Sequence, residues 1–566
     1  MNRQSYPKHI LSTRIRTCAA ALALAGAVWS LAPASHLQAD EKPGSYASAT
    51  TPALSPVLPF DVDRKALQAY VGKVDPSEEE ILKAHRLFDT LAWQAFVALN
   101  WPAGENGEPA KGKDMSDNTG WRMWNFWRSS GSIFLPDGAE PAPWDNKLQP
   151  AGYRFKAVAN LGSCGHTSAR DNFEAFTGPL VDQNGNWARF EIRVNQEEFD
   201  YIRNNGLYSQ DGQVEFSKKL TDNQVELPLD GNGKHGAIEI KLAWKQMGPN
   251  DDPSRFYTTD LTVDRSEQEG VEPNPEKIRV GLVGMHISMR TQSSPEWIWS
   301  TFEQIDNVRS NPLPGGGMSH PNFNNPANTT APVNELAPFN AKFGPNGYPV
   351  PATGADATTW IESLTKAPTQ ATRVVVPTQP LLNPLDAKLG AVAAEMNKAF
   401  QALLQKENSV FQYYELIDAQ WPLHPNAPAF AGGAGSAPES IRYKTPGEMI
   451  PVFLVNTTME TFFQKGEQAA GNLEQDDRLD SSVGGNAIID STKVFGTESC
   501  VGCHYSSGVA IGFKKNPDGS EMVVNGKPVP IYGENNHFGK TGNASFSWML
   551  QLEPQAKKRP VVAAQK

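Results

Sequence analysis

Apolar residues repeat at helical spacing in two long segments of the chain. The first runs from Asp75 toward Asn100, and its apolar stripe consists of Ile81, Phe88, Ala92, Ala95 and Leu99. Asp75 is the predicted N-cap, with Pro76 at the first helical position, because these residue types favour those places. His85 lies on the same stripe, where a packed core histidine is the usual occupant. A second amphipathic helix is predicted over 385–405.

From about residue 150 the hydrophobic period changes to two, as expected for strands with one buried face. Apolar and charged residues alternate over 188–194 and 238–245. A third strand is predicted over 278–289, in which His286 shares a face with Ile278, Val280 and Leu282. A short helix is predicted over 295–305, because Ser294-Pro295 is a helix-start signal.

Clean alternation favours an antiparallel sheet, and no glycine-rich phosphate loop follows any of these strands. We therefore predict an α+β fold, with an antiparallel sheet or sandwich core, flanking helices and many long loops. Residues 40–74 are expected to form an extended arm. The patterns divide the chain into six regions: a leader (1–39), an N-terminal arm and helical region (40–150), a β-rich domain (151–310), a Pro/Asn/Gly-rich loop region (311–384), a helix and linker (385–438) and a C-terminal region (439–566).

The first 39 residues have the pattern of a secretory signal peptide. A basic start is followed by an apolar run over 19–31, and small residues follow at Ala32, Ala34 and Ala39. The apolar run is shorter than the ~20 residues that span a bilayer, so we expect no transmembrane segment in the mature chain. The leader predicts a periplasmic location, reached by secretion.

Composition and charge narrow the choice of partners. The chain has 566 residues, is 39% hydrophobic and carries a formal net charge of −11. Loss of the leader removes four basic residues and no acidic ones, which makes the net charge −15. An acidic protein of this kind is a poor partner for nucleic acid and suits docking to a basic protein.

The stretch Cys500-Val501-Gly502-Cys503-His504 carries the most specific chemistry in the chain. Two thiols at i and i+3 lie on one face of a helical turn, where each can add to a vinyl group of one porphyrin. The motif therefore predicts one covalent haem c, with Cys500 and Cys503 as thioether ligands and His504 as the proximal iron ligand. A zinc site or a thioredoxin-like dithiol fits less well, because only Cys164 remains outside the leader and no βαβ unit precedes the motif. Cys164 is left without an assigned role, a buried inert thiol being its common state.

The side chain opposite His504 would decide between an electron carrier and an enzyme. Two strong protein ligands fill both axial positions of the iron, whereas a single ligand leaves one position free for a substrate. Met549, His537 and Met459 are the leading candidates for the sixth ligand. Further candidates are Met522, Met449, His286 and His85. Met549 falls in a predicted closing helix over 545–552, where a packed core methionine is equally expected. Hairpin turns are predicted at 517–519 and 525–526.

With these motifs the chain resembles the large, single-haem cytochrome c family proteins of bacterial periplasms. The resemblance rests on three segments: 91–96, 281–303 and 498–504. It would cover nearly the whole mature chain, and it implies a C-terminal c-type haem-binding region and electron transfer. In the second segment, His286 and Glu303 have the titratable groups that a distal pocket could use, although a structural ion pair is the more common role of such residues.

Three functions are compatible with these residues. The first is an electron-transfer cytochrome with a redox partner protein. The second is a haem enzyme, peroxidase- or oxygenase-like, with an open sixth position on the iron. The third is a haem-containing sensor or ligand-binding protein. Carbon monoxide binding to the reduced protein separates an open iron from one with two protein ligands.

Overall fold

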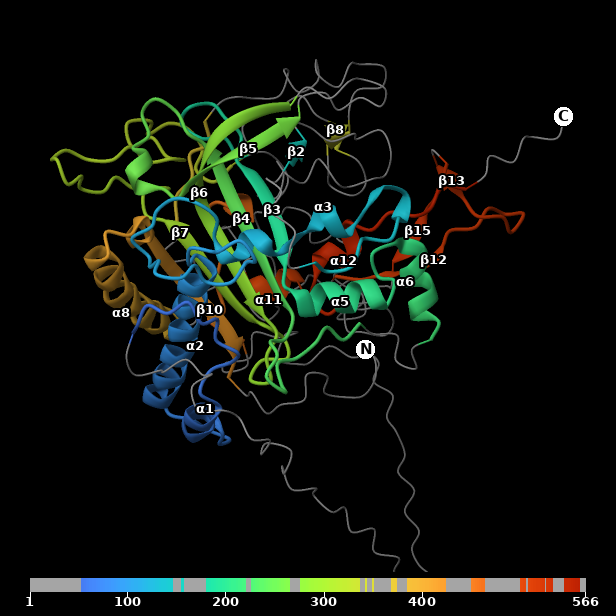
Figure 1. The fold of residues 1–566 in the computed structure, drawn as a ribbon, viewed down its shortest axis with the longest axis horizontal. Coiled ribbons are helices and arrows are strands. Elements are labelled where there is room, and N and C mark those ends of the chain that lie inside the picture. Colours follow the sequence, from blue (N-terminus) through green and yellow to red (C-terminus); the bar gives the residue numbers. More distant parts are fainter. Residues whose placement is uncertain are drawn as a thin grey trace, which may run out of the picture. The chain divides into compact units, whose positions relative to one another are not determined.

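A nine-stranded sheet organises the described part of the chain, and its pairings are antiparallel except that of β2 with β5 (Figure 1). The computed structural model describes residues 52–145, 154–156, 180–219, 225–264, 275–335, 342–343, 349–350, 368–373, 384–423, 449–463, 499–504, 507–524, 526–532 and 544–559. The strands are β1 (Arg128–Ser129), β2 (Arg154–Lys156), β3 (Arg189–Val194), β4 (Ile238–Gln246), β5 (Thr258–Asp264), β6 (Pro275–Met289), β7 (Ile298–Gln304), β10 (Tyr414–Pro422) and β11 (Met449–Ile450). Their order is β1-β3-β4-β6-β7-β10-β11, with β5 pairing β6 and β2 off this path. The predicted leader over 1–39 and Cys164 lie outside the described residues.

Helices cover this sheet. The longer ones are α1 (Arg64–Val71), α2 (Glu78–Leu99), α5 (Gln196–Asn204), α6 (Gln210–Ser217) and α8 (Pro384–Lys406). The shorter ones are α3 (Ser130–Ile133), α11 (Cys500–His504), α12 (Trp548–Leu552) and the 3₁₀ turns η1 (Met123–Phe126), η2 (Pro136–Gly138), η3 (Pro253–Arg255), η4 (Val410–Tyr413) and η5 (Thr461–Phe463). Small hairpins complete the described fold: β8 (Lys342–Phe343) with β9 (Pro349–Val350), β12 (Ala510–Phe513) with β15 (Pro530–Tyr532), and β13 (Val523–Val524) with β14 (Lys527–Pro528). The α+β class and the antiparallel sheet are confirmed.

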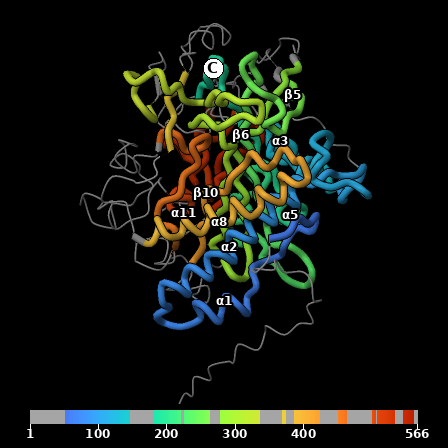
Figure 2. Tube along the Cα trace, turned by 90° about the vertical axis from the view of Figure 1, so that its left-hand side faces the viewer, coloured from blue at the N-terminus to red at the C-terminus, as the bar shows by residue number. Residues whose placement is uncertain are grey.

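The two faces of the sheet bury different cores. On one face, α2 and α8 lie side by side over the sheet, and α1 packs on α2 (Figure 2). This core includes Phe96, Phe302 and Phe400, whose rings contact Trp93. On the other face, Trp299 of β7 packs with Val501 of α11 and Met549 of α12 in a separate apolar cluster. The C-terminal motif helix is therefore held against the sheet face that α2 and α8 leave uncovered.

Two of the predicted helices are confirmed, and the predicted start of a third helix is wrong. The helix over 385–405 corresponds to α8, and the closing helix over 545–552 corresponds to α12. The start of α2 is wrong by two residues, because the N-cap is Ser77 and not Asp75. Ser77 and Glu80 exchange the two hydrogen bonds of a capping box, which fixes the helix start after Ser77. The extended arm is also wrong in part, since α1 forms within it.

The predicted helix over 295–305 is wrong: residues 298–304 form β7. Trp297 has a positive φ of 70° in a tight turn that its N–H closes by donating to the Ser294 carbonyl. All seven residues of β7 are buried, because cores lie on both faces of this central strand. A strand of this kind has no solvent-exposed face, so its hydrophobic pattern does not show the period of two.

The face assigned to His286 is wrong as well, and a β-bulge is the cause. On β4, Ala243 pairs with Gly284 and Trp244 pairs with Leu282, so Val283 is an extra residue in β6. The extra residue reverses the alternation. The core under α2 and α8 takes Ile278, Val280 and Leu282 before the bulge and Met285, Ile287 and Met289 after it. His286 therefore lies on the opposite face, the face that carries α11.

Candidate functional site

The motif helix α11 is fixed to the sheet by a buried glutamine. The side-chain oxygen of Gln420 in β10 accepts the N–H of Val501 at 2.9 Å, and its amide nitrogen donates to the Pro451 carbonyl at 2.6 Å. Ser499 Oγ lies within hydrogen-bond distance of both Gln420 side-chain polar atoms. Trp548 of α12 donates its indole N–H to the Cys503 carbonyl at 2.9 Å. These bonds hold the five-residue helix between β10 and α12.

Cys500 and Cys503 are thiols on this helix and are not joined in a disulfide. Cys500 Sγ lies 3.8 Å from the Leu454 carbonyl oxygen. Burial, together with the nearby Glu460 carboxylate, raises the pKa of the Cys500 thiol well above its usual value. A thiol in this state is not the low-pKa thiolate of a redox dithiol. The surroundings of Cys500 thus argue against the thioredoxin-like interpretation.

The imidazole of His504 has one nitrogen fixed by the protein. Its Nδ1 lies 2.8 Å from the Phe546 carbonyl oxygen, which can only accept, so Nδ1 carries the proton and Nε2 carries the lone pair. The ring packs against Trp299 with centroids 4.6 Å apart. Burial lowers the pKa of His504 to about 4, so the ring is neutral at neutral pH. A neutral imidazole whose second nitrogen donates to a backbone carbonyl is what a metal-ligating histidine requires.

His286 lies beside this site as a consequence of the bulge in β6. Its Cα partners on the neighbouring strands are Lys241 of β4 and Thr301 of β7, and Trp299, which contacts His504, is two residues from Thr301. His286 Nε2 lies 3.6 Å from Glu460 Oε2. Burial alone would raise the pKa of Glu460, but the adjacent His286 holds it below its usual value. The two form an acid–base pair next to α11.

The segment 456–460 that carries Glu460 is anchored to the sheet. Asn456 donates to Thr301 Oγ1 at 2.8 Å and to the Phe302 carbonyl at 3.0 Å. Glu303 accepts the N–H of Thr457 at 2.7 Å and pairs with Arg373 at 2.9 Å. Glu303, predicted as one titratable group of a distal pocket, therefore has a structural role, and the carboxylate beside His286 is Glu460. The spacing of the sequence did not reveal Glu460, because it meets His286 only through the tertiary fold.

The three leading sixth-ligand candidates have different places. Met549 is buried in the apolar cluster that also contains Val501 and Phe546. Met459 is buried in another cluster, with Phe190 and Val283. His537 lies outside the described residues. Both methionines are thus packed in apolar clusters, and their role as iron ligands stays a prediction.

Gly284 permits the close approach of segment 456–460 to β6. A Cβ at this position would lie 2.3 Å from Thr458 Oγ1 and 3.2 Å from Met459 Cε. We expect Gly284→Ala to lower the free energy of unfolding by about 1–3 kcal/mol, because the segment must move away. Urea denaturation measures this, with Gly390→Ala in α8 as the matched control. A Cβ added at Gly390 would meet no atom within 4 Å, so that variant should be stabilised by up to about 1 kcal/mol, and equal effects of the two changes would contradict the close approach.

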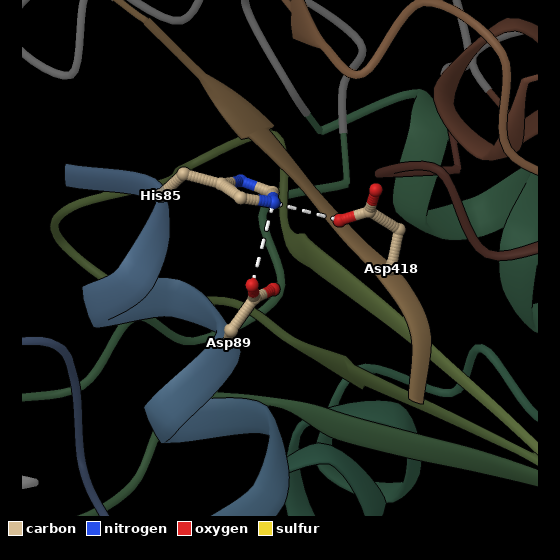
Figure 3. Close-up of side chains that lie close together, drawn as sticks. All are labelled: His85, Asp89 and Asp418. Carbon is tan, nitrogen blue, oxygen red and sulfur yellow. Dashed lines mark ion pairs between the residues drawn. The ribbon is translucent and has the colours of Figure 1, made fainter. Parts of the chain in front are cut away.

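A second group of titratable side chains is buried near the same end of β10, where Asp418 and Trp421 flank Gln420. His85 Nε2 lies 2.8 Å from Asp418 Oδ1 and 3.4 Å from Asp89 Oδ2 (Figure 3). His85 Nδ1 accepts a hydrogen bond of 2.8 Å from the indole N–H of Trp421. These residues come from α2 and β10, and all of them are buried.

The hydrogen bond from Trp421 decides how this group holds its protons. Burial lowers the pKa of His85 while Asp89 and Asp418 raise it, with a net rise to about 9. The indole N–H of Trp421 can only donate, however, so its hydrogen bond keeps His85 Nδ1 unprotonated. The ring is then neutral, with its proton on Nε2 facing the two carboxylates. A metal on Nε2 would need Nδ1 as a donor, which Trp421 prevents. The arrangement of His85, Asp89 and Asp418 is therefore better suited to sharing a proton than to binding a metal ion.

Asp89 carries the additional proton of this group. Neither of its oxygens has a hydrogen-bond partner in the described part of the chain. Burial raises the pKa of Asp89 from 3.8 to about 8. The folded state thus binds more protons than the unfolded state between these values, and stability falls as the pH rises through this interval, by at most about 1.4 kcal/mol per pH unit.

We expect Asp89→Asn to reduce this pH dependence, because asparagine does not titrate. Denaturant unfolding of the two proteins across the interval measures the difference in slope. Asp61, Glu296 and Asp386 also have pKa values raised to about 7, but they contribute equally to both proteins. Identical slopes for Asp89→Asn and wild type would show that Asp89 is ionised in the folded state.

The fold and the site together define an α+β protein in which a CxxCH helix rests on one face of an antiparallel sheet. Comparisons with family models, with curated proteins and with solved structures give no match for this chain. Among the described helices, none has both the length and the apolar character of a membrane span. Function is therefore inferred from the residues of the site.

Proposed function

We propose that this chain is an exported c-type cytochrome that binds one haem and transfers electrons in the periplasm. Cys500 and Cys503 would form the two thioethers, and His504 would ligate the iron. In each thioether the thiol sulfur and its hydrogen add across one vinyl double bond, so nothing is oxidised or reduced. The bound haem would supply one-electron chemistry through its ferric and ferrous states.

The observation that supports this proposal most is the state of His504. Its Nδ1 faces the Phe546 carbonyl, its ring is buried and neutral, and its second nitrogen has no hydrogen-bond partner among the described residues. The two sulfurs of the same helix are thiols and not a disulfide. Each residue of the motif thus has the chemical state that haem attachment and iron ligation need.

The rest of the chain would bury the cofactor and tune its potential. Gln420 and Trp548 hold the motif helix, and Trp299 covers the face of His504. Burial and hydrogen bonding of the axial ligand are the means by which a protein sets the potential of a haem. The net charge of −15 expected after loss of the leader suits a basic redox partner protein.

A potentiometric titration followed by optical spectroscopy tests the proposed function. The protein is produced in a host that matures c-type cytochromes and is purified from the periplasm. We expect the whole haem spectrum to change reversibly with the slope of a one-electron couple. An iron that cannot be cycled reversibly, or a protein that consumes peroxide or dioxygen at a high rate, would favour the haem-enzyme alternative.

A further inference from the structure

We infer that His286 is the second axial ligand of the iron, on the side opposite His504, and that Glu460 orients its imidazole. This inference rests on the proposed function, since it requires a haem on α11. It differs from the three leading candidates predicted from the sequence, Met549, His537 and Met459.

The register of the sheet places His286 next to the motif helix. His286 pairs with Thr301, and Ser288 pairs with Trp299. His286 and Trp299 are therefore diagonal neighbours on one face of the sheet, a separation of about 7–8 Å in antiparallel sheets. Since Trp299 contacts the ring of His504, His286 and His504 lie over the same part of the sheet. They are close enough for His286 to be one of the groups that lower the pKa of His504.

Each histidine has one ring nitrogen directed at an oxygen of the protein, Nδ1 in His504 and Nε2 in His286. One nitrogen of His504 faces the Phe546 carbonyl, and one nitrogen of His286 faces the Glu460 carboxylate. Within the described residues, His504 Nε2 has no hydrogen-bond partner, and His286 makes no hydrogen bond, its Nε2 lying 3.6 Å from Glu460, so each ring keeps a nitrogen available. Metal-ligating histidines are held in this manner, with the second nitrogen directed at a carbonyl or carboxylate.

Glu460 is itself held in place. The backbone N–H of Asn456 donates to its Oε2 at 2.7 Å, and Asn456 is bonded to Thr301 and Phe302 of β7. The same carboxylate is among the charges that act on Cys500 of the motif. The Glu460 carboxylate therefore lies within electrostatic range of the Cys500 thiol.

The competing methionines are engaged elsewhere. Met459 directs its Cε toward Gly284 and packs in the core with Phe190 and Val283. Met549 packs with Val501 and Phe546, the residue whose carbonyl holds the back of the His504 ring. Met549 thus shares an apolar cluster with the residue whose carbonyl fixes the His504 ring.

Spectroscopy of the purified holoprotein tests the assignment. We expect ferric low-spin haem with two imidazole ligands in electron paramagnetic resonance, no near-infrared charge-transfer band of methionine sulfur, and no rapid carbon monoxide binding in the reduced state. His286→Ala should give a high-spin or water-ligated ferric haem and rapid carbon monoxide binding, and added imidazole should restore the low-spin spectrum. His320→Ala removes an exposed histidine and should leave every spectrum unchanged.

Two further variants keep the test decisive if His286→Ala folds poorly. His286→Met should stay six-coordinate and gain the methionine band. Glu460→Gln should stay low-spin and raise the midpoint potential, because a carboxylate next to a ligating imidazole favours the ferric state. A methionine band in the wild type, or unchanged spectra in both His286 variants with haem attached, would overturn the assignment. Loss of covalent haem from the wild type itself would instead refute the proposed function.

Discussion

Replacing Cys500 and Cys503 together by alanine is expected to abolish covalent haem attachment completely. Each thioether needs one of these sulfurs, and no other described residue places a thiol on the site. The measurement is a pyridine haemochrome assay after extraction with acidified acetone, which removes haem that is not covalently bound. The expected result is one haem per chain for the wild type and none for the double variant.

Cys164→Ala is the matched control for this loss, since it removes a thiol that does not belong to the motif. It should retain one haem per chain. Single variants, Cys500→Ala and Cys503→Ala, are expected to keep at most one thioether and to show an altered haemochrome band. Normal haem content in the double variant would contradict the role assigned to both sulfurs.

Replacing His85 by leucine is expected to lower the free energy of unfolding by about 3–5 kcal/mol at neutral pH. The substitution removes the group that faces the buried carboxylate of Asp418 and also the acceptor of the Trp421 indole N–H. A buried charge without its partner is costly because it has lost its hydration. Urea unfolding of the purified protein measures the change.

Asp89→Asn is the control for the His85 variant, because it alters the same group and leaves in place the hydrogen bond from Trp421 to His85 and the contact of His85 with Asp418. Its stability at neutral pH should be at least that of the wild type, since no hydrogen bond to Asp89 is lost and the cost of keeping this buried carboxyl protonated disappears. If His85→Leu were as stable as the wild type, His85 would not stabilise the buried side chain of Asp418.

Local patterns were sufficient for much of the architecture. The apolar stripe of α2 and the alternation in β3 and β4 predicted those elements, because each has one buried and one more polar face. The predictions were wrong where burial on both faces or a β-bulge changed the local sequence pattern. β7 is buried on both faces and so lost its period, and one extra residue at Val283 moved His286 to the other face. Gly281 and Gly284 in the same strand were the available signal, since glycine within a strand often marks a bulge.

In the candidate site, too, some residues could be predicted from the sequence and others could not. Cys500, Cys503 and His504 could be proposed from the sequence alone, because the chemistry expected of them depends on spacing along the chain. Phe546, Gln420 and Glu460 were not, because their contacts join residues that are 42, 81 and 174 positions distant in sequence: His504 to Phe546, Gln420 to Val501, and His286 to Glu460. Their roles depend on a carbonyl direction, a buried amide and a strand register, which no single-sequence pattern specifies.

The same register explains why the site lies on this face of the sheet. The core under α2 and α8 fills one side of β4, β6 and β7 with large apolar residues. The other side presents His286, Thr301 and Trp299 in neighbouring positions, and α11 is bonded to β10 next to them. A cofactor held by α11 would therefore meet side chains of the sheet directly.

Covalent haem attachment is decided by intact-mass spectrometry of the denatured protein, purified from a host that matures c-type cytochromes. We expect a mass equal to that of the chain without its leader plus one haem, and a tryptic peptide containing residues 500–504 that carries the whole addition. A mass with no added macrocycle, or a disulfide between Cys500 and Cys503, would contradict haem attachment and every role derived from it.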